Sequence, residues 1–192
     1  MDRLAAAAAI SPGTTEEIAA TVRELADQQA IRNLSAVYSM AVDGHDLATT
    51  LACFTEHGAF ERAGVTTAGQ DALHSFFTTM MSRYSTTLHT PEMHVITVEQ
   101  GDPRTASGVA TGHAELVLEG TLMLAAYRYD DEYAVEAGRW RFSRRRLRYT
   151  YVLPFESMAT GFGDTRRIRW PQTPFQEADL PESLPTWSDH LA

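Results

Sequence analysis

The sequence predicts an α+β protein in which a curved, mixed or antiparallel sheet wraps around a long N-terminal helix, with three helices in all. Two observations carry this prediction. Apolar residues up to Tyr84 recur mainly at three- and four-residue steps, which is typical of helices, whereas from Thr87 onward strand-like runs alternate with turn signals. Helices followed by strands, without regular alternation, indicate an α+β arrangement.

The first helix is predicted from its start signal and its apolar spacing. Thr14 and Glu17 have the spacing of a capping box, and Gly44 is a stop signal. The apolar phase shifts between Leu25 and Ile31, so we expect the helix to bend or break there.

Two further helices are expected before the strands begin. Asp46 is placed to cap a short helix that reaches Phe54, and 70–84 is strongly amphipathic. Its stripe consists of Leu73, Phe76, Phe77, Met80, Met81 and Tyr84. Such a stripe is typical of a core-facing helix, and its methionines also suit the wall of a pocket for a hydrophobic ligand. A short strand is expected between the helices, over 56–62.

The second half predicts an antiparallel meander of four strands. They span 88–99, 105–118, 121–133 and 139–153, with turn signals between them. In the last strand the apolar residues change parity between Phe142 and Leu147. This change indicates a bulge near Arg144–Arg146.

The ends of the chain differ from its middle. We expect a flexible leader over 1–13, one domain over 14–155, and a proline-rich extension over 156–192 that packs on the domain or on a partner subunit. The extension carries Trp170, Phe175 and Trp187, too many large aromatic residues for a free linker. Asp2 and a weak apolar stretch argue against a signal peptide, so a cytoplasmic protein is expected.

Composition excludes several kinds of chemistry. The net charge is −9, which argues against nucleic-acid partners and anionic membranes, and no apolar run approaches the roughly 20 residues that span a bilayer. All sixteen basic residues are arginines, so Schiff-base lysine chemistry is excluded. The single cysteine, Cys53, allows no intrachain disulfide and is interpreted as a core residue. Six arginines within 139–148 are interpreted as a solvated or ion-paired strand.

Asp43 and His89 are the most informative polar residues. Asp43 ends the first predicted helix, and His89 opens the first long strand. A carboxylate at a helix C-terminus opposes the helix dipole and needs a donor nearby. If the fold brings the two together, Asp43 would orient His89 as a general base that needs no metal or organic cofactor. A buried histidine without a catalytic role is the alternative.

Other polar residues have weaker support. His94 lies an odd number of residues from His89 and should face the opposite side of a regular strand, so the two form a poor metal pair. His113 and Glu115 share one strand face and are candidates for a second polar wall. No convincing metal or nucleotide motif is present, so no metal and no cofactor are expected.

The segment Ala30-Ile-Arg-Asn-Leu34 followed by Tyr38, Asp43-Gly44 and Asp46 resembles the cone-shaped nuclear transport factor 2-like superfamily, and its SnoaL-like branch in particular. The resemblance covers roughly residues 18–153. The enzymes that the sequence resembles within this branch are of the bile-acid dehydratase, scytalone dehydratase and hexachlorocyclohexane dehydrochlorinase types. Asp43 and His89 match the catalytic pair of the first and third types, and Tyr38 matches a tyrosine of the first.

The resemblance implies a cofactor-independent lyase of dehydratase type that acts on a hydrophobic polycyclic, polyketide or terpenoid-like molecule. Tyr38 would assist a departing oxygen, although five residues of helix separate it from Asp43 by about 140°. An isomerase or cyclase and a non-catalytic binding or assembly module are the alternatives. Relatives of this kind usually self-associate, so a homo-dimer or homo-trimer is expected. The proposed pocket residues are Phe76, Met80, Met93, Tyr127, His113 and Glu115.

Overall fold

The computed structural model describes residues 13–191, and all of the predicted leader except Gly13 lies outside them. The first helix, α2 (Thr15–Asp43), begins at the predicted capping box: Thr14 accepts from the Glu17 backbone and the Glu17 side chain accepts from the Thr14 backbone. The short α3 (Leu47–Ala52) is capped by Asp46, which accepts from the Thr49 backbone at 2.9 Å.

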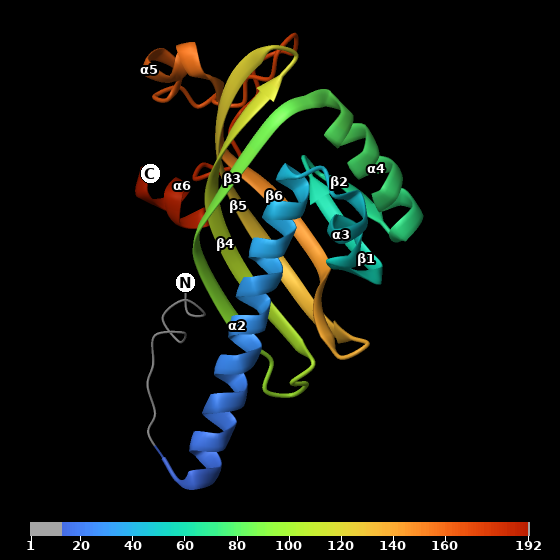
Figure 1. The fold of residues 1–192 in the computed structure, drawn as a ribbon. Helices are drawn as coiled ribbons and strands as arrows, with labels where there is room; N and C mark the ends of the chain where they lie inside the picture. The colour runs from blue at the N-terminus through green and yellow to red at the C-terminus, as the bar shows by residue number, and fades with distance from the viewer. Residues whose placement is uncertain (1–12, 192) are drawn as a thin grey trace.

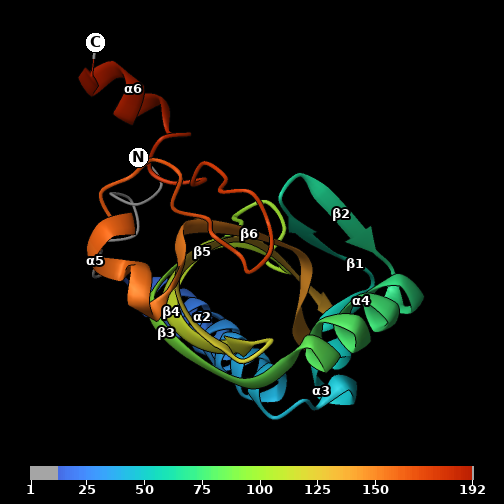
Figure 2. The ribbon, with the colours of Figure 1, turned by 90° about the horizontal axis from the view of Figure 1, so that it is seen from above.

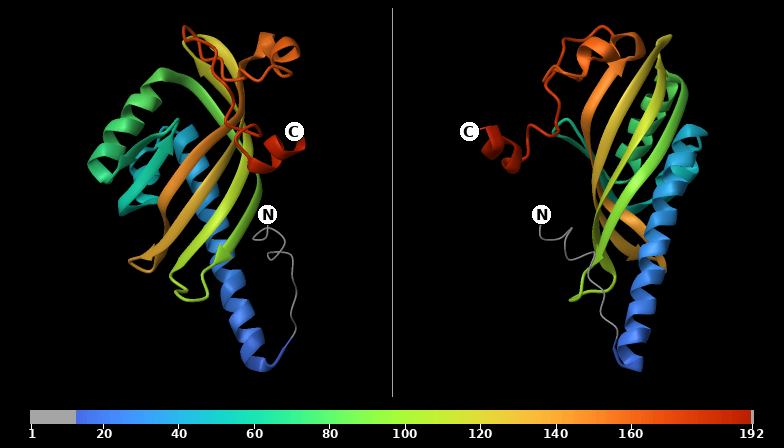
Figure 3. Two further views of the ribbon diagram at one scale, coloured as in Figure 1. Left: turned by 180° about the vertical axis from the view of Figure 1, so that it is seen from behind. Right: turned by 90° about the vertical axis from the view of Figure 1, so that its left-hand side faces the viewer.

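Helix α2 runs without a break, so the expected bend after Leu25 is wrong. Its first half extends past the end of the sheet (Figures 1 and 3), where Ile18, Val22 and Leu25 are all more than half exposed. The helix contacts the sheet mainly through its second half, in which Ile31 and Tyr38 are buried. A change of apolar phase therefore does not require a bend, because Ile18, Val22 and Leu25 of the first half are not packed against the sheet in the described part of the chain.

The sheet has six strands in the order β2-β1-β6-β5-β4-β3. These strands are β1 (Phe54–Arg62), β2 (Val65–Ala68), β3 (Tyr84–Val98), β4 (Thr105–Leu118), β5 (Thr121–Glu136) and β6 (Arg139–Pro154). All neighbours are antiparallel except β1 and β6, which pair in parallel. The α+β prediction of a curved mixed sheet around a long helix is thus confirmed.

The sheet curls around α2 and α4 (Gln70–Arg83), as Figure 2 shows from above. The predicted helices are present, and the extension adds two short ones, α5 (Met158–Gly161) and α6 (Pro185–Leu191), after a 3-10 turn over Phe155–Ser157. Tyr38 from α2 packs edge-on against Phe54, Phe77 and Phe142 in the middle of the core. Such aromatic packing suits a cone, because large rings fill a tapering space.

Register shifts bend the long strands. In β6 one shift lies between Phe142 and Arg144, just before the predicted position. The extra residue there lets the apolar side chains before and after it face the same side of the sheet, although their positions change parity. In β3 another lies between Pro91 and His94. Because one extra residue is inserted there, His94 faces α2 like His89, and the predicted opposite orientation is wrong.

The C-terminal extension lies along β6 beyond the last residue that pairs with β1. The Val152 backbone donates to the Arg167 carbonyl at 2.8 Å and accepts from Arg169 at 2.8 Å. The Asp179 carboxylate accepts from the Tyr149 backbone at 2.8 Å. These contacts satisfy the part of the β6 edge that β1 leaves unpaired. No helix within 13–191 is long and apolar enough to cross a membrane.

Candidate active site

The fold brings Asp43 and His89 into contact. The last residue of α2 presents its carboxylate to the start of β3, where His89 Nδ1 lies 2.6 Å from Asp43 Oδ1. The His89 backbone N–H donates to Oδ2 at 2.8 Å, and the Thr87 hydroxyl donates to Oδ1 at 2.8 Å. Both side chains are more than four-fifths buried. The need for donors at this helix end is therefore met by β3.

The electrostatics keep Asp43 ionised. Burial alone would raise the pKa of this carboxyl, but the hydrogen bonds and charge of His89, together with the Thr87 hydroxyl, outweigh burial and lower the pKa below its usual value. An ionised carboxylate can only accept, so His89 Nδ1 is the donor. In the neutral imidazole, Nε2 is then the nitrogen left to take a proton.

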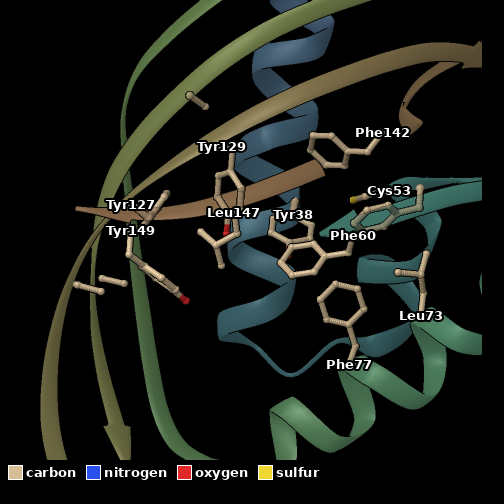
Figure 4. Packing of buried hydrophobic residues seen from close by; sticks show 14 of the residues in the cluster. Tyr38, Cys53, Phe60, Leu73, Phe77, Tyr127, Tyr129, Phe142, Leu147 and Tyr149 are labelled. Carbon is tan, nitrogen blue, oxygen red and sulfur yellow. The ribbon is translucent and has the colours of Figure 1, made fainter. Parts of the chain in front are cut away.

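His89 lines a partly open apolar pocket bordered by the sheet, α2 and α4. The free volume is about 90 Å³, and the lining side chains are Tyr38, Val42, His45, Phe60, Arg62, Phe76, Phe77, Met80, Met81, Tyr84, Thr87, His89, Leu116, Tyr129, Leu147 and Tyr149. Figure 4 shows Tyr38, Phe60, Phe77, Leu147 and Tyr149 gathered around this space. In this state it suits one ring-sized group, and the flexible methionines could make room for more.

Tyr38 lies deep in this pocket. Its ring is almost fully buried, and its hydroxyl hydrogen-bonds Tyr129. Burial raises the pKa of the Tyr38 hydroxyl, and the nearby Arg145 charge opposes this effect only in part. Tyr38 therefore keeps its proton at neutral pH and can donate a hydrogen bond, but it cannot serve as a base.

Arg145 is a residue that sequence reasoning did not single out. It is fully buried beneath the pocket, where it pairs with Asp131 at 2.9 and 3.0 Å and stacks 4.5 Å from the Tyr38 ring centre and 3.9 Å from that of Tyr129. The only signal was its place in the arginine-rich run. Its neighbours Arg144 and Arg146 are half exposed and pair with Glu61, as expected for a solvated or ion-paired strand. Arg145 is ion-paired too, but it is fully buried.

His94 belongs to the same buried group. Its Nε2 atom lies 2.9 Å from the Tyr133 hydroxyl, which donates to Asp131 at 2.9 Å. Burial, with the positive charges of Arg145 and Arg32, lowers the pKa of His94 to about 4. His94 is thus neutral near pH 7, and its Nε2–H donates to the Tyr133 hydroxyl oxygen, because the single proton of that hydroxyl goes to Asp131.

The other predicted pocket residues are divided by the sheet. Phe76 and Met80 line the pocket, whereas Met93 is 66% exposed beside the β3 bulge. His113 and Glu115 are exposed on the outer face of β4, where His113 Nδ1 lies 2.8 Å from Glu92 Oε1. The expected second polar wall does not border the pocket, because the inner face of β4 carries the neighbouring residues, such as Ala114.

Tyr127 is absent from the pocket lining but packs against His89, with ring centres 5.9 Å apart. Its hydroxyl is buried without a hydrogen-bond partner, and burial raises its pKa to about 12. It lies opposite Gly112, where an added Cβ would come within 2.5 Å of the Tyr127 hydroxyl. This glycine therefore lets Tyr127 reach across β4 toward β3.

Two further expectations concern metals and Cys53. Among residues 13–191, no group of three or more His, Cys, Asp or Glu side chains is arranged to hold a metal ion. Cys53 is buried, and burial raises the pKa of its thiol to about 11, which disfavours the reactive thiolate.

The cone-shaped α+β fold thus holds an Asp–His pair whose histidine lines an apolar pocket. The SnoaL-like domain model matches residues 23–146, and this chain belongs to that family, within the nuclear transport factor 2-like superfamily. The resemblance seen in the sequence is confirmed.

Solved structures share the fold. A candidate scytalone dehydratase from Novosphingobium aromaticivorans is 19% identical, with a TM-score of 0.64 over 80% of this chain and 99% of that one. Hexachlorocyclohexane dehydrochlorinase LinA-type3 from Novosphingobium barchaimii is 19% identical, with a TM-score of 0.63 over 70% and 94%. A candidate aromatic ring hydroxylase from N. aromaticivorans is 25% identical, with a TM-score of 0.63 over 71% and 98%. No curated protein sequence matches the chain.

Proposed function

We propose that this protein is a lyase of dehydratase type that needs no cofactor and acts on a hydrophobic polycyclic, polyketide or terpenoid-like molecule. The observation that carries the proposal is the 2.6 Å contact between Asp43 and His89, whose side chain lines the apolar pocket. The names of the structural relatives, a dehydrochlorinase and a candidate dehydratase, favour elimination chemistry.

The geometry suggests how elimination would proceed on a β-hydroxy carbonyl compound. His89 Nε2 takes the proton on the carbon next to the carbonyl, and Asp43 stabilises the imidazolium that forms. The electrons of the broken C–H bond form a C=C bond while the C–O bond breaks. Tyr38 hydrogen-bonds the departing hydroxyl oxygen, and His89 gives the proton that it took from carbon to this oxygen. Water therefore leaves, and His89 is neutral again.

The experiment is a screen of hydrophobic β-hydroxy ketones with product analysis by mass spectrometry. We expect loss of water, and a rate about 10²–10⁴-fold lower in His89→Ala. His74→Gln, which changes an exposed histidine on α4, is the matched control and should keep full activity. A fully active His89→Ala variant would exclude the mechanism.

The same screen tests the alternatives. A product of unchanged mass would show that His89 returns the proton to another carbon, as in an isomerase or cyclase. Saturable binding without any turnover would identify a non-catalytic binding module. We further propose a homo-dimer or homo-trimer in the cytoplasm, and light scattering on the purified protein measures the assembly.

A further inference from the structure

Arg62, the last residue of β1, faces the apolar pocket that His89 lines. We propose that its guanidinium binds a carboxylate of the ligand, so that the pocket selects hydrophobic carboxylic acids over neutral compounds of the same shape. This inference deepens the proposed function and rests on it for the view that the pocket is the substrate site.

The surroundings of Arg62 are unusual for a cation. The pocket lining contains no aspartate or glutamate within the described chain, and Arg62 is its only arginine. Phe60 lies two residues before Arg62 on the same face of β1 and is buried and apolar. The residue that pairs with Arg62 on β6 is Leu147, which is also buried and apolar. A charge in such surroundings is costly unless an opposite charge or good hydrogen bonds offset it.

The contacts of Arg62 hold the side chain in place without neutralising it. Its guanidinium lies 4.9 Å from the ring centre of Trp170 and 5.7 Å from that of Tyr149. It hydrogen-bonds Tyr84, and Nη1 lies 3.9 Å from the Met80 sulfur. The two aromatic rings fix the plane of the guanidinium. A guanidinium has five N–H donors, and the contacts with Tyr84 and Met80 use few of them.

The nearest carboxylate on β1 is already occupied. Glu61 points to the opposite face of the strand, where Arg144 and Arg146 both pair with it. No ion pair of Arg62 occurs within residues 13–191. The charge of Arg62 is therefore available to a ligand in the pocket.

The chemistry favours a carboxylate as the ligand group. A planar guanidinium matches the two oxygens of a carboxylate in a bidentate pair. A phosphate monoester carries close to two negative charges, and the pocket offers it one arginine and otherwise mostly apolar walls. With the carboxylate held by Arg62, the apolar body of the ligand would fill the space bounded by Phe76, Phe77 and His89.

Trp170 links this arrangement to the C-terminal extension. Its ring stacks on Arg62 and packs edge-on against Tyr149, with ring centres 5.9 Å apart. The extension thus supplies one of the two aromatic faces that fix the guanidinium.

The test measures binding of three one-ring probes to the full chain by calorimetry. The probes are 3-phenylpropanoate, the neutral 3-phenylpropanamide and 2-phenylethyl phosphate. We expect the carboxylate to bind about tenfold or more tightly than the amide, because one charge-assisted pair supplies that preference. The phosphate should bind less tightly than the carboxylate.

Variants assign the preference to Arg62. The Arg62→Gln variant should bind the carboxylate and the amide probe equally, and its affinity for the amide should equal that of the wild type. Arg62→Lys, which keeps the charge and not the planar fork, should retain part of the preference. Arg139→Gln removes the same charge from an exposed position outside the pocket and should behave as wild type. Thermal melting of each variant establishes that it is folded.

The proposal would be overturned if the wild type bound the acid and the amide with equal affinity, or if the acid showed no saturable binding at millimolar concentration. It would also be overturned if Arg62→Gln kept the carboxylate preference, or if the phosphate bound the wild type more tightly than the carboxylate. Because binding is measured without turnover, these results are independent of the elimination mechanism. Asp43→Asn should keep the carboxylate preference even if it abolishes catalysis.

Discussion

Replacing Asp43 by asparagine tests the central contact without knowledge of a substrate. The carboxylate accepts three hydrogen bonds, from the His89 ring, the His89 backbone and the Thr87 hydroxyl, at 2.6 to 2.8 Å. An asparagine has one oxygen, so its amide group must face one of these donors. Hydrogen bonds to a charged group contribute about 1.5–3 kcal/mol each, and the retained contacts lose their charge assistance. We expect the free energy of unfolding at pH 7 to fall by about 2–3 kcal/mol.

The stability that the Asp43 carboxylate contributes should decrease as the pH falls. The folded state lowers the pKa of Asp43, so its contribution to stability is complete above the unfolded pKa of about 3.9 and is lost as pH falls through the folded value. The difference between wild type and Asp43→Asn should therefore narrow as pH falls from about 5 toward about 3.

The assay is urea unfolding followed by tryptophan fluorescence at a series of pH values. Asp71→Asn, which changes an exposed carboxylate in the first turn of α4, is the control and should shift stability by less than about 0.5 kcal/mol. An Asp43→Asn variant as stable as wild type at pH 7, or a decrement that does not change with pH, would refute the contact as described.

Two further substitutions test how the core supports the site. Gly112→Ala should destabilise the fold by about 1–3 kcal/mol in thermal or urea unfolding, because its Cβ would lie 2.5 Å from the Tyr127 hydroxyl and 2.6 Å from the Thr90 carbonyl; wild-type stability would refute this close packing. Asp131→Asn should cost about 3–5 kcal/mol, since it leaves the buried Arg145 charge unpaired. Adding Arg145→Met should recover part of that loss, and a double variant less stable than Asp131→Asn would contradict this account.

Much of the fold was predictable because its signals are local. Capping at Thr14 and Asp46, the amphipathic 70–84 segment and the four long strands depend on residues within a few positions of each other. The strand β2 was missed because Val65–Ala68 is short and mostly exposed, and the parallel pairing of β1 with β6 joins segments far apart in sequence.

The site was predictable only in part. Asp43, His89 and Tyr38 were found through a resemblance, and their residue types suited the chemistry. His94 was placed on the wrong face because a bulge inserts one residue after Pro91. A proline within a strand fits an edge strand as well as a bulge, so Pro91 alone did not predict the bulge.

The sequence by itself determined the three main helices, the five longer strands, their order, the absence of lysine chemistry and a candidate proton-transfer pair. Tertiary structure decided which polar side chains share an environment. Within one arginine-rich strand it left Arg144 half exposed and buried Arg145 completely, and it turned Arg62 toward the pocket that His89 lines. The physical reason is that burial and ion pairing depend on neighbours from distant strands, whereas helix and strand formation depend mainly on neighbours along the chain.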